Sequence, residues 1–405
     1  MLTAWTVSAW AEEQYTRVRW TAAPEEAFCG SENARLLAGT ADGKNLLIAG
    51  ADGMWLWDGG SGARLSLRFL PDTDQGLLAD LVFRCLQNHP TLSRKYKRAE
   101  LEEMLTARRE AYLSASGLAG FESLDQLYEC YPELLSMGRF QLSALNERYA
   151  VGVLFSVCAA AVDLETGLCC LLVGQGWGPA LCGDRLLTDK GMTDLTTGRT
   201  TDDLDEMGLI QPESPIDVEP LLLTSAHPLL FSDGTLILAA AASDYQTADD
   251  GRLCQNFYAA DTRNGGTAYL IGTFSAGGLP QVLVASGDER YVFLYSKSAM
   301  FYEPSYLLDR VAGTVTAVEH MVPVTGLAHG FLCYDMSVYQ LCVLDPETMA
   351  RTPVAYENEA FLPEEIAERG VPVTFISCLS GGGLLYQTNF GGNEQGVARG
   401  YFILE

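Results

Sequence analysis

Short apolar runs separated by closely spaced glycine turns constrain this chain more than any other feature of its sequence. The stretch from Ala41 to Leu67 reads ADGKNLLIAGADGMWLWDGGSGARLSL, with Asp-Gly or Gly-Gly pairs between the runs. Aspartate and glycine supply the positive φ angles that tight hairpin turns require. The pattern therefore predicts an antiparallel meander of four strands: Ala34–Thr40, Asn45–Ala49, Met54–Asp58 and Ala63–Phe69.

The same pattern returns along the rest of the chain. A second set of strands is predicted at Arg139–Leu145, Tyr149–Ser156, Val157–Asp163 and Leu168–Val173. Looser sets follow within Pro228–Phe274, Pro280–His320 and Pro323–Tyr356. Repetition of one four-stranded unit is typical of a β-propeller, whose blades surround a central channel.

The two ends of the chain together supply one more set. Three strands are predicted at Val373–Leu379, Leu384–Phe390 and Gly400–Leu404, and a strand without a set at Tyr15–Trp20. If Tyr15–Trp20 lies outside Gly400–Leu404, the ring has no open seam. The predicted fold class is all-β: a single six-bladed, possibly seven-bladed, β-propeller over residues 1–405, closed by an N-terminal strand. A pair of β-sandwiches would explain the strands but not the shared circular register.

Three strand ends give the chain a family resemblance. LWD at 56–58, VD at 162–163 and VLD at 343–345 each end a strand in aspartate, and a turn (GGSG, LETG or PET) follows. The chain therefore resembles the WD40-like β-propellers over roughly two thirds of its length. It lacks the Gly-His dipeptide typical of eukaryotic members, so the resemblance is to a divergent, bacterial kind.

Two long segments interrupt the strand pattern. Residues 70–137 are predicted to be an α-helical insertion between the first two blades, because GLLADLVFRCLQ and RAELEEMLTARREAYLSA space apolar residues at helical intervals. A third short helix is predicted at Leu124–Tyr131. Residues 174–227 are predicted to be an acidic, irregular insertion or a degenerate blade, with strands around Ala180–Thr188 and Pro220–Ser225.

Both insertions are expected on one rim of the propeller. Connections from a second to a third strand share a rim with the connections between blades, and the insertions belong to this class. Turns on the opposite rim are mostly tight. Loops cost only modest entropy anywhere on a surface, so their segregation favours use of this rim in binding. The alternative is that one rim merely accepted insertions.

The helical insertion carries a concentrated positive charge. SRKYKR places Arg94, Lys95, Lys97 and Arg98 around Tyr96. Positive charge at a helix start opposes the helix dipole, so the benefit of these cations is expected elsewhere. We expect them to dock on the acidic insertion or to meet an acidic partner, although a solvated loop is the ordinary outcome for such a run.

The acidic insertion contributes two weaker candidates. Asp202, Asp203, Asp205 and Glu206 supply hard oxygens for calcium, but their spacing lacks the D-x-D-x-D-G loop. In the helical insertion, Asp72-x-Asp74-x-Gly76 is similarly incomplete. Trp177, in GQGWGPALCG, is expected to stack on a ligand or to anchor a partner, or else to cover a blade edge.

Composition excludes several classes of function. The net charge of -26 would repel nucleic acid and an anionic membrane surface. No apolar run reaches the ~18 residues that span a bilayer. The four histidines lie in no nucleophile or Cys–His signature, so no catalytic residue and no cofactor are predicted.

The cysteines and the first residues bear on localisation. Eleven cysteines, an odd number without metal-ligand spacing, favour reduced thiols in the cytoplasm. Ala9-Trp10-Ala11 resembles a signal-peptidase site, so secretion is the alternative if the true start lies upstream and cleavage follows Ala11.

These features favour a non-enzymatic scaffold that binds a protein partner through one elaborated rim. The expected contact residues are Trp177, Arg94, Lys95, Tyr96, Lys97 and Arg98. The alternative is an extracytoplasmic propeller that binds or hydrolyses a carbohydrate with carboxylates near its central channel. Under this alternative the ligand is a small molecule or a glycan.

Overall fold

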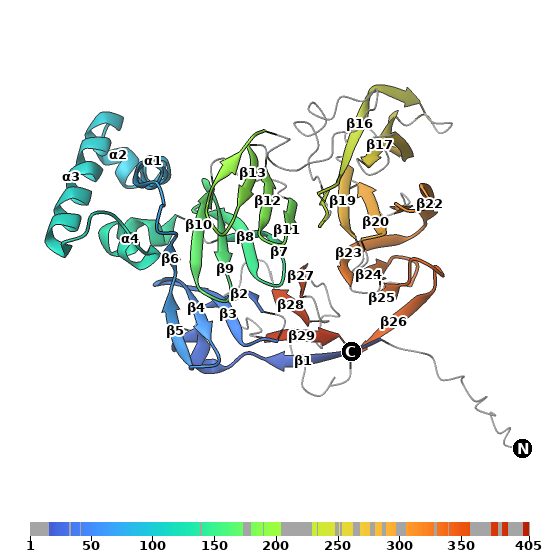
Figure 1. The fold of residues 1–405 in the computed structure, drawn as a ribbon, viewed down its shortest axis with the longest axis horizontal. Helices are drawn as coiled ribbons and strands as arrows, with labels where there is room; N and C mark the ends of the chain where they lie inside the picture. Colours follow the sequence, from blue (N-terminus) through green and yellow to red (C-terminus); the bar gives the residue numbers. More distant parts are fainter. Residues whose placement is uncertain are drawn as a thin grey trace, which may run out of the picture.

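Six β-sheets, built mainly from antiparallel strands that follow one another in sequence, form the framework of the residues that the structure describes (Figure 1). The structure, a computed structural model, describes residues 16–31, 34–40, 42–137, 140–172, 180–188, 190–203, 229–232, 234–247, 251, 253–261, 268–275, 280–285, 289–296, 305–327, 330–338, 340–356, 374–379, 383–387 and 400–404. Its helices α1 to α4 all lie between the first two strand sets. The predicted all-β propeller architecture with one helical segment is therefore present.

The first two blades follow the predicted strand sets closely. The first contains β2 (Arg35–Gly39), β3 (Asn45–Gly50), β4 (Gly53–Asp58) and β5 (Ala63–Ser66). The second contains β7 (Gln141–Leu145), β8 (Tyr149–Leu154), β9 (Cys158–Asp163) and β10 (Leu168–Leu172). A fifth strand, β6 (Arg68–Phe69), pairs in parallel with β10, so the chain touches the second blade before it enters the helices.

A third sheet lies inside the segment for which the sequence predicts an irregular insertion or a degenerate blade. Its antiparallel strands are β11 (Ala180–Cys182), β12 (Arg185–Thr188), β13 (Gly191–Asp194) and β14 (Thr200–Thr201). The described residues within 180–201 therefore form a four-stranded sheet, and the choice between an irregular insertion and a degenerate blade over residues 174–227 stays a prediction. The other predicted strand, Pro220–Ser225, lies outside the described residues.

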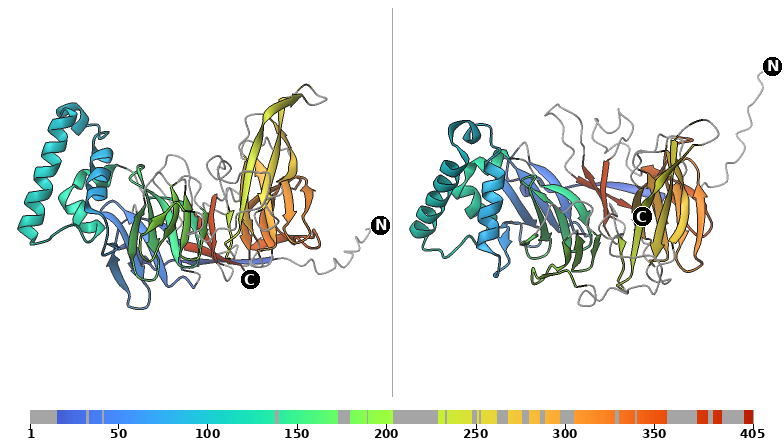
Figure 2. Two further views of the ribbon diagram at one scale, coloured as in Figure 1. Left: turned by 45° about the horizontal axis from the view of Figure 1, so that its top comes forward. Right: turned by 90° about the horizontal axis from the view of Figure 1, so that it is seen from above.

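Two further four-stranded sheets complete the separate blades. The fourth contains β15 (Leu229–Leu230), β16 (Leu236–Thr247), β17 (Leu253–Asp261) and β18 (Ala268–Ser275). The fifth contains β19 (Pro280–Ala285), β20 (Tyr291–Ser296), β21 (Ser305–Asp309) and β22 (Thr314–Val318). Both views of Figure 2 place these blades at the end of the molecule opposite to the helices.

The remaining strands merge into one sheet of eight. Its order is β23 (Met321–Leu327), β24 (Gly330–Asp335), β25 (Gln340–Leu344), β26 (Arg351–Tyr356), β1 (Thr16–Ala22), β29 (Gly400–Leu404), β28 (Gly383–Gln387) and β27 (Thr374–Leu379). The predicted set Pro323–Tyr356 and the predicted terminal set are thus the two halves of this sheet.

The N-terminal strand joins these two halves. β1 pairs antiparallel with β29, with Val18 opposite Leu404, which is the pairing that the sequence predicts. β1 also pairs in parallel with β26, with Thr16 opposite Val354. Because β1 is bonded on both sides, five sheets rather than six or seven stand as separate blades, and the predicted blade number is wrong. The closed ring stays a prediction.

The helices occupy the predicted segment. They are α1 (Gln75–Leu86), α2 (Leu92–Lys95), α3 (Arg98–Ser116) and α4 (Leu124–Cys130), and the two 3-10 helices of the described residues are η1 (Glu25–Phe28) and η2 (Pro132–Ser136). The Asp74 carboxylate accepts the Gly76 N–H to begin α1, and Gly117 ends α3 in the left-handed conformation (φ 69°). The sequence analysis did not predict α2. Across the described chain, no helix is long and apolar enough to cross a membrane.

One turn repeats where third strands end. The aspartate side chain accepts the N–H of the residue two positions further on, and the aspartate carbonyl accepts the N–H four positions further on. That last residue has a positive φ and is glycine in four turns and Met349 in the fifth. The aspartates are Asp58, Asp163, Asp194, Asp309 and Asp345. The strand-end aspartates behind the WD40-like resemblance are therefore turn-capping residues.

Candidate interaction surface

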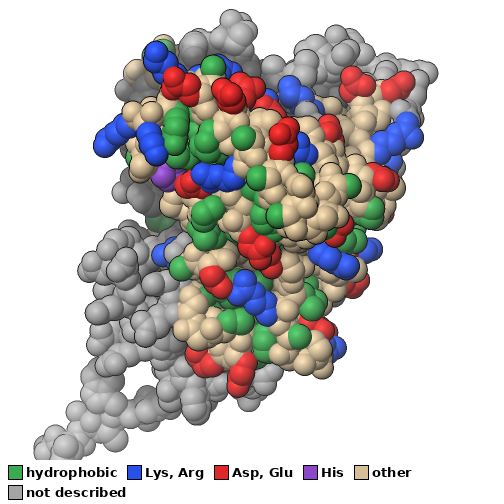
Figure 3. Space-filling view, turned by 90° about the vertical axis from the view of Figure 1, so that its left-hand side faces the viewer, with side chains coloured by type: hydrophobic (Ala, Val, Ile, Leu, Met, Phe, Trp, Pro, Cys, Tyr) green, Lys and Arg blue, Asp and Glu red, His purple; other side chains and the backbone are tan. Residues whose placement is uncertain are grey.

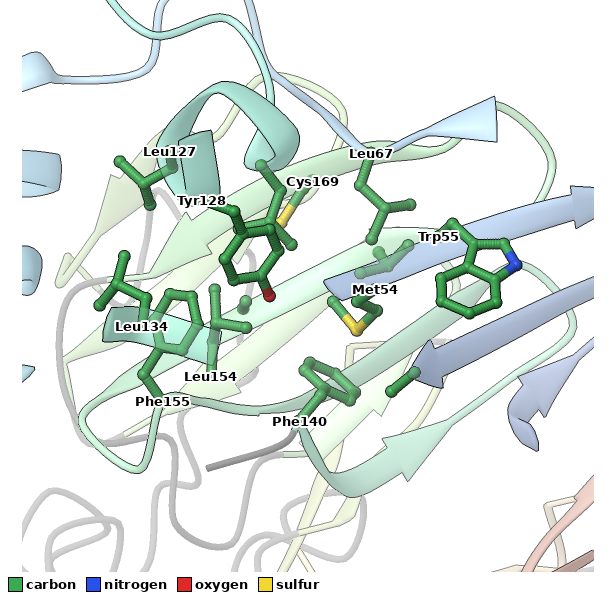
Figure 4. Packing of buried hydrophobic residues seen from close by; sticks show 14 of the residues in the cluster. Met54, Trp55, Leu67, Leu127, Tyr128, Leu134, Phe140, Leu154, Phe155 and Cys169 are labelled. Carbon is green, nitrogen blue, oxygen red and sulfur yellow. The ribbon is translucent and has the colours of Figure 1, made fainter. Parts of the chain in front are cut away.

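Helix α4 holds the insertion against the first two blades. Tyr128 projects from α4 toward Met54 and Leu154 (Figure 4), and its ring meets Phe155 edge-on with centroids 5.8 Å apart. A Cβ at Gly53, whose φ is +130°, would lie 2.9 Å from the Tyr128 ring. Gly53 and Phe155 lie at connections between second and third strands. The helices therefore lie against the rim on which the sequence predicts the insertions.

Two backbone hydrogen bonds tie the segment that begins α4 to the chain that leads into the insertion. The Leu124 N–H donates to the Leu67 carbonyl at 2.9 Å, and the Phe69 N–H donates to the Glu122 carbonyl at 2.8 Å. Buried residues of α1, α3 and α4 belong to the same hydrophobic cluster as β3, β4 and β8. The insertion therefore packs on its own propeller.

The inner face of α3 is held by polar contacts. Arg108 donates two hydrogen bonds to the Glu133 carboxylate, at 3.0 and 2.8 Å. Burial raises the pKa of Glu133, but these bonds outweigh it and leave that pKa below its ordinary value. The Tyr112 hydroxyl donates to the Glu129 carboxylate at 2.7 Å, and burial together with this bond raises the pKa of Tyr112 to about 12. The outer face of α3 stays exposed.

The basic cluster, which we define as Arg94, Lys95, Lys97 and Arg98, lies at the junction of α2 and α3. Arg94 and Lys95 end α2, and Lys97 and Arg98 begin α3. All four side chains are exposed, and Tyr96 between them is half-buried.

Two of these cations lie close to aromatic rings. The Lys95 Nζ lies 5.0 Å from the centre of the Tyr96 ring, and the Arg98 guanidinium lies 5.5 Å from that of Phe83. No cation of the basic cluster forms an ion pair within 4.0 Å with a residue that the structure describes, whereas Arg84 and Arg108 of the same insertion do. The cluster therefore has its charge available for another molecule.

The face that carries the insertion mixes all kinds of side chain. Figure 3 shows Lys and Arg groups set among Asp, Glu and apolar side chains on that face. A partner on this face would therefore meet positive charge locally and not across a broad surface. Local charge of this kind selects the orientation of a partner more than it adds affinity.

Of the other predicted site residues, the structure describes only Asp202 and Asp203. Trp177, Asp205 and Glu206 lie outside the described residues. Asp202 and Asp203 follow β14 and are exposed. No group of three metal-ligating side chains occurs in the part of the chain that the structure describes. The calcium site and the role of Trp177 stay predictions.

His89 has a structural position in the insertion. Its Nδ1 accepts the N–H groups of Thr91 and Leu92 at 3.3 and 3.4 Å, and its Nε2 lies 3.2 Å from the Ser136 hydroxyl. The imidazole therefore caps α2 and ties it to η2.

A cavity of about 200 Å³ lies where β6 leads into α1. It is bounded by the start of the insertion, by β10 and by the turn between β13 and β14. Its polar lining consists of Asp72, Thr73, Asp74, Thr197 and Thr200, and its other lining residues are Leu70, Leu77, Cys170, Leu171 and Gly198. The sequence analysis missed this cavity because it depends on the third blade.

Comparison with known proteins finds only distant structural likenesses. No protein-family profile and no curated protein match the chain. It is similar to the β-propeller domain of Cps50 (Swd1) from Myceliophteria thermophila, with 10% identity over 79% of this chain and 85% of that one and a TM-score of 0.34. It is similar to the C-terminal WD40 domain of Sif2, with 8% identity over 97% and 96% of the chains and a TM-score of 0.33. It is also similar to oligogalacturonate lyase from Vibrio parahaemolyticus, with 13% identity over 98% of both chains and a TM-score of 0.39. Likenesses this distant carry no information about the function of this chain.

Proposed function

We propose that this chain is a non-enzymatic interaction module that captures an acidic segment of a protein partner with the basic cluster. The observation that carries this proposal is the exposure of four cations that have no ion pair with any described residue, in a chain of net charge -26. Tyr96 lies within the same run and offers an aromatic surface beside them.

The position of the cations supports a role outside folding. Lys97 and Arg98 begin a helix of 19 residues, where positive charge opposes the helix dipole by about 0.3–1 kcal/mol for each exposed group. Arg94 and Lys95 end α2, where positive charge is favourable. Because two of the four cations work against the fold locally, their benefit is expected in binding. The shared core beneath them fixes the surface before a partner arrives, which lowers the cost of association.

The test reverses the charge of the basic cluster. The variant Arg94→Glu, Lys95→Glu, Lys97→Glu, Arg98→Glu should lose the partner that the wild-type chain captures from its native host, and added salt should weaken wild-type capture. Its melting temperature should be nearly unchanged, because the negative charge gained at the start of α3 favours the fold and the negative charge gained at the end of α2 disfavours it.

The matched control is Arg84→Glu, an exposed cation of the same insertion that is paired with Asp80 at 2.6 Å. This control should capture the partner normally. Unaltered capture by the charge-reversed cluster would remove the cluster from the proposal. A lowered melting temperature would instead favour docking of the cluster on the acidic part of its own chain.

Three further features are part of the proposal: Trp177, the calcium candidates and the closed ring. We propose that Trp177 adds an anchor, so Trp177→Ala should weaken capture of the same partner. If the calcium candidates bind calcium, calorimetric titration of the wild-type chain with calcium should release or absorb heat. The double variant Asp202→Asn, Asp203→Asn should give no such heat. We also propose that the ring closes through the pairing of β1 with β29, which cross-linking of residues 18 and 404 would test.

A cytoplasmic location is part of the same proposal. None of the ten cysteines whose side chains are described is in a disulfide, which agrees with reduced thiols. The alternative is secretion with cleavage after Ala11. N-terminal sequencing of the native protein distinguishes the two, because a secreted form would begin at Glu12.

The carbohydrate alternative is favoured by the cavity beside α1. Two carboxylates and three threonine hydroxyls line it, which suits a ligand that carries several hydroxyl groups. A glycan array with the wild-type chain tests this function, and Asp72→Asn should abolish any signal without removing the Asp74 cap of α1. An array without signal would reject the carbohydrate alternative, and protein binding would be the only proposed function left.

A further inference from the structure

Two cysteines face each other across the hairpin β24–β25. Cys333 and Cys342 are direct partners in the antiparallel register. Side chains at such positions project from the same face of the sheet, with Cβ atoms about 4.5–5.5 Å apart. A disulfide needs Cβ atoms about 3.5–4.5 Å apart. A small adjustment of the hairpin would therefore bring the two sulfur atoms within bonding distance.

This juxtaposition is unique among the strand pairings that the structure describes. Cys169 and Cys170 of β10 face Val162 and Ala161, and the other described strand cysteines likewise face residues of other kinds. Although the chain has eleven cysteines, the described strand pairings contain a single pair in which one cysteine lies opposite another.

The surroundings of the pair are apolar. Cys333 and Cys342 belong to the cluster that packs the fifth blade against β24 and β25. The Cys342 sulfur lies 4.0 Å from the sulfur of Met321. Besides burial, the Asp335 carboxylate raises and the Arg351 guanidinium lowers the pKa of both thiols. A disulfide, which is apolar, would suit this cluster as well as two thiols do.

We propose that Cys333 and Cys342 are a reversible dithiol–disulfide site that staples β24 to β25. The oxidant is a small-molecule disulfide such as glutathione disulfide. The Cys342 thiolate attacks it, forms a mixed disulfide and expels one glutathione thiolate. The Cys333 thiolate then attacks the Cys342 sulfur and expels the second. Two protein thiols give up two protons and two electrons, and glutathione disulfide becomes two glutathione thiols.

Burial determines how fast this site responds. Cys333 is fully buried and Cys342 is 4% exposed, so Cys342 is the sulfur that reacts first. Burial raises the pKa of Cys342 to about 11 and holds that of Cys333 well above its ordinary value. Few thiolates therefore exist at neutral pH, and oxidation should be slow, faster at higher pH and faster in mild denaturant.

The experiment equilibrates the full-length chain with glutathione disulfide in mild urea, returns it to native buffer, and alkylates it in strong denaturant. The expected result is two alkylated cysteines fewer than in the reduced chain, a peptide that links Cys333 to Cys342, and reversal by dithiothreitol. The oxidised chain should melt a few degrees higher than the reduced one, because the bond restricts the unfolded chain.

Two variants control the mapping. Cys342→Ala should retain every alkylation site under oxidation, whereas Cys169→Ala, which removes a buried cysteine outside the pair, should still lose two. Complete alkylation of the wild-type chain after oxidation, or a bond that maps to other cysteines, would overturn the proposal. The wild-type peptide map decides the question even if a variant fails to fold.

Discussion

A buried ion pair between the fourth and fifth blades allows a quantitative test of the packing. The Arg310 and Asp261 side chains are both completely buried, and the Arg310 guanidinium donates to the Asp261 carboxylate at 2.7 and 3.1 Å. It also donates to the Thr235 hydroxyl at 2.6 Å and to the Glu289 carbonyl at 3.1 Å. The guanidinium lies 3.4 Å from the centre of the Phe231 ring. Arg310 thus joins the turns of two blades in one desolvated network.

The expected energies follow from this arrangement. Asp261→Asn or Arg310→Met alone removes one member of a fully buried ion pair and should cost about 3–5 kcal/mol of the free energy of unfolding. The double variant removes both charges together with the hydrogen bonds from Arg310 to the Thr235 hydroxyl and the Glu289 carbonyl, and should cost about 2–4 kcal/mol. The sum of the two single effects should therefore exceed the double effect by at least about 2 kcal/mol.

Equilibrium urea unfolding of the four proteins, followed by far-UV circular dichroism, measures this coupling. Arg290→Met is the matched control, because Arg290 is a partly exposed arginine of the neighbouring turn, paired with Asp309 at 2.7 Å. It should cost at most about 1 kcal/mol. Additive effects of Asp261→Asn and Arg310→Met within about 0.5 kcal/mol would refute the reasoning, since they would show that the pair is not desolvated.

Three further predictions concern the insertion. Gly53→Ala should cost about 2–3 kcal/mol, because it adds a clash with Tyr128 to a φ of +130°, whereas Gly62→Ala, with a φ of +66° and open space, should cost about 1 kcal/mol in urea unfolding. Tyr128→Ala should cost about 3–5 kcal/mol and speed hydrogen exchange in α1 and α4, and unchanged protection of these helices would contradict the docking. The lowered pKa of Glu133 means that its bond to Arg108 stabilises the fold at neutral pH, and that this benefit declines below the ordinary pKa of 4.5 and is gone once the pH is below the lowered pKa. Glu133→Gln should therefore flatten the fall of the melting temperature on acidification from about pH 6 to about pH 3, and an equally steep fall in this variant would contradict the assignment.

Local chemistry made most of the strands predictable. Turn residues mark the ends of hairpin strands directly, so Asn45–Ala49 was expected where β3 runs from Asn45 to Gly50. Helical spacing of apolar residues likewise located α1, α3 and α4, because each buries one stripe against the blades. α2 was not predicted since its four residues are too few to show a period.

The main sequence feature that the prediction did not use is a repeated turn that marks the third blade. DLETG at 163–167 and DLTTG at 194–198 are nearly the same turn, and both fold in the same way, with the aspartate accepting the N–H two residues on. The strands around the second copy have two to four residues, so apolar alternation hardly develops there. Comparison of turn sequences would have found this blade.

Contacts between distant parts of the chain could not be predicted in this way. The pairing of β1 with β26 depends on where the chain ends meet, and no local pattern records it. The same holds for Tyr128 against Gly53 and for Arg310 with Asp261, whose partners lie far away in the sequence. For the candidate site, the sequence located the basic cluster, and the structure added its exposure and its lack of ion pairs with described residues.

The two faces of α3 separate binding from stability in a way that can be tested. Leu101 and Leu105 face the core, while the cations that begin the helix face solvent. A substitution on the inner face changes the packing of the blades and the position of the surface together, so it must lower stability whenever it lowers capture. A substitution in the basic cluster changes charge that forms no ion pair with a described residue, so its effect on stability should be small. If the proposed function is right, loss of capture without loss of stability will be confined to the outer face, and an inner-face variant with that same behaviour would place the binding site elsewhere.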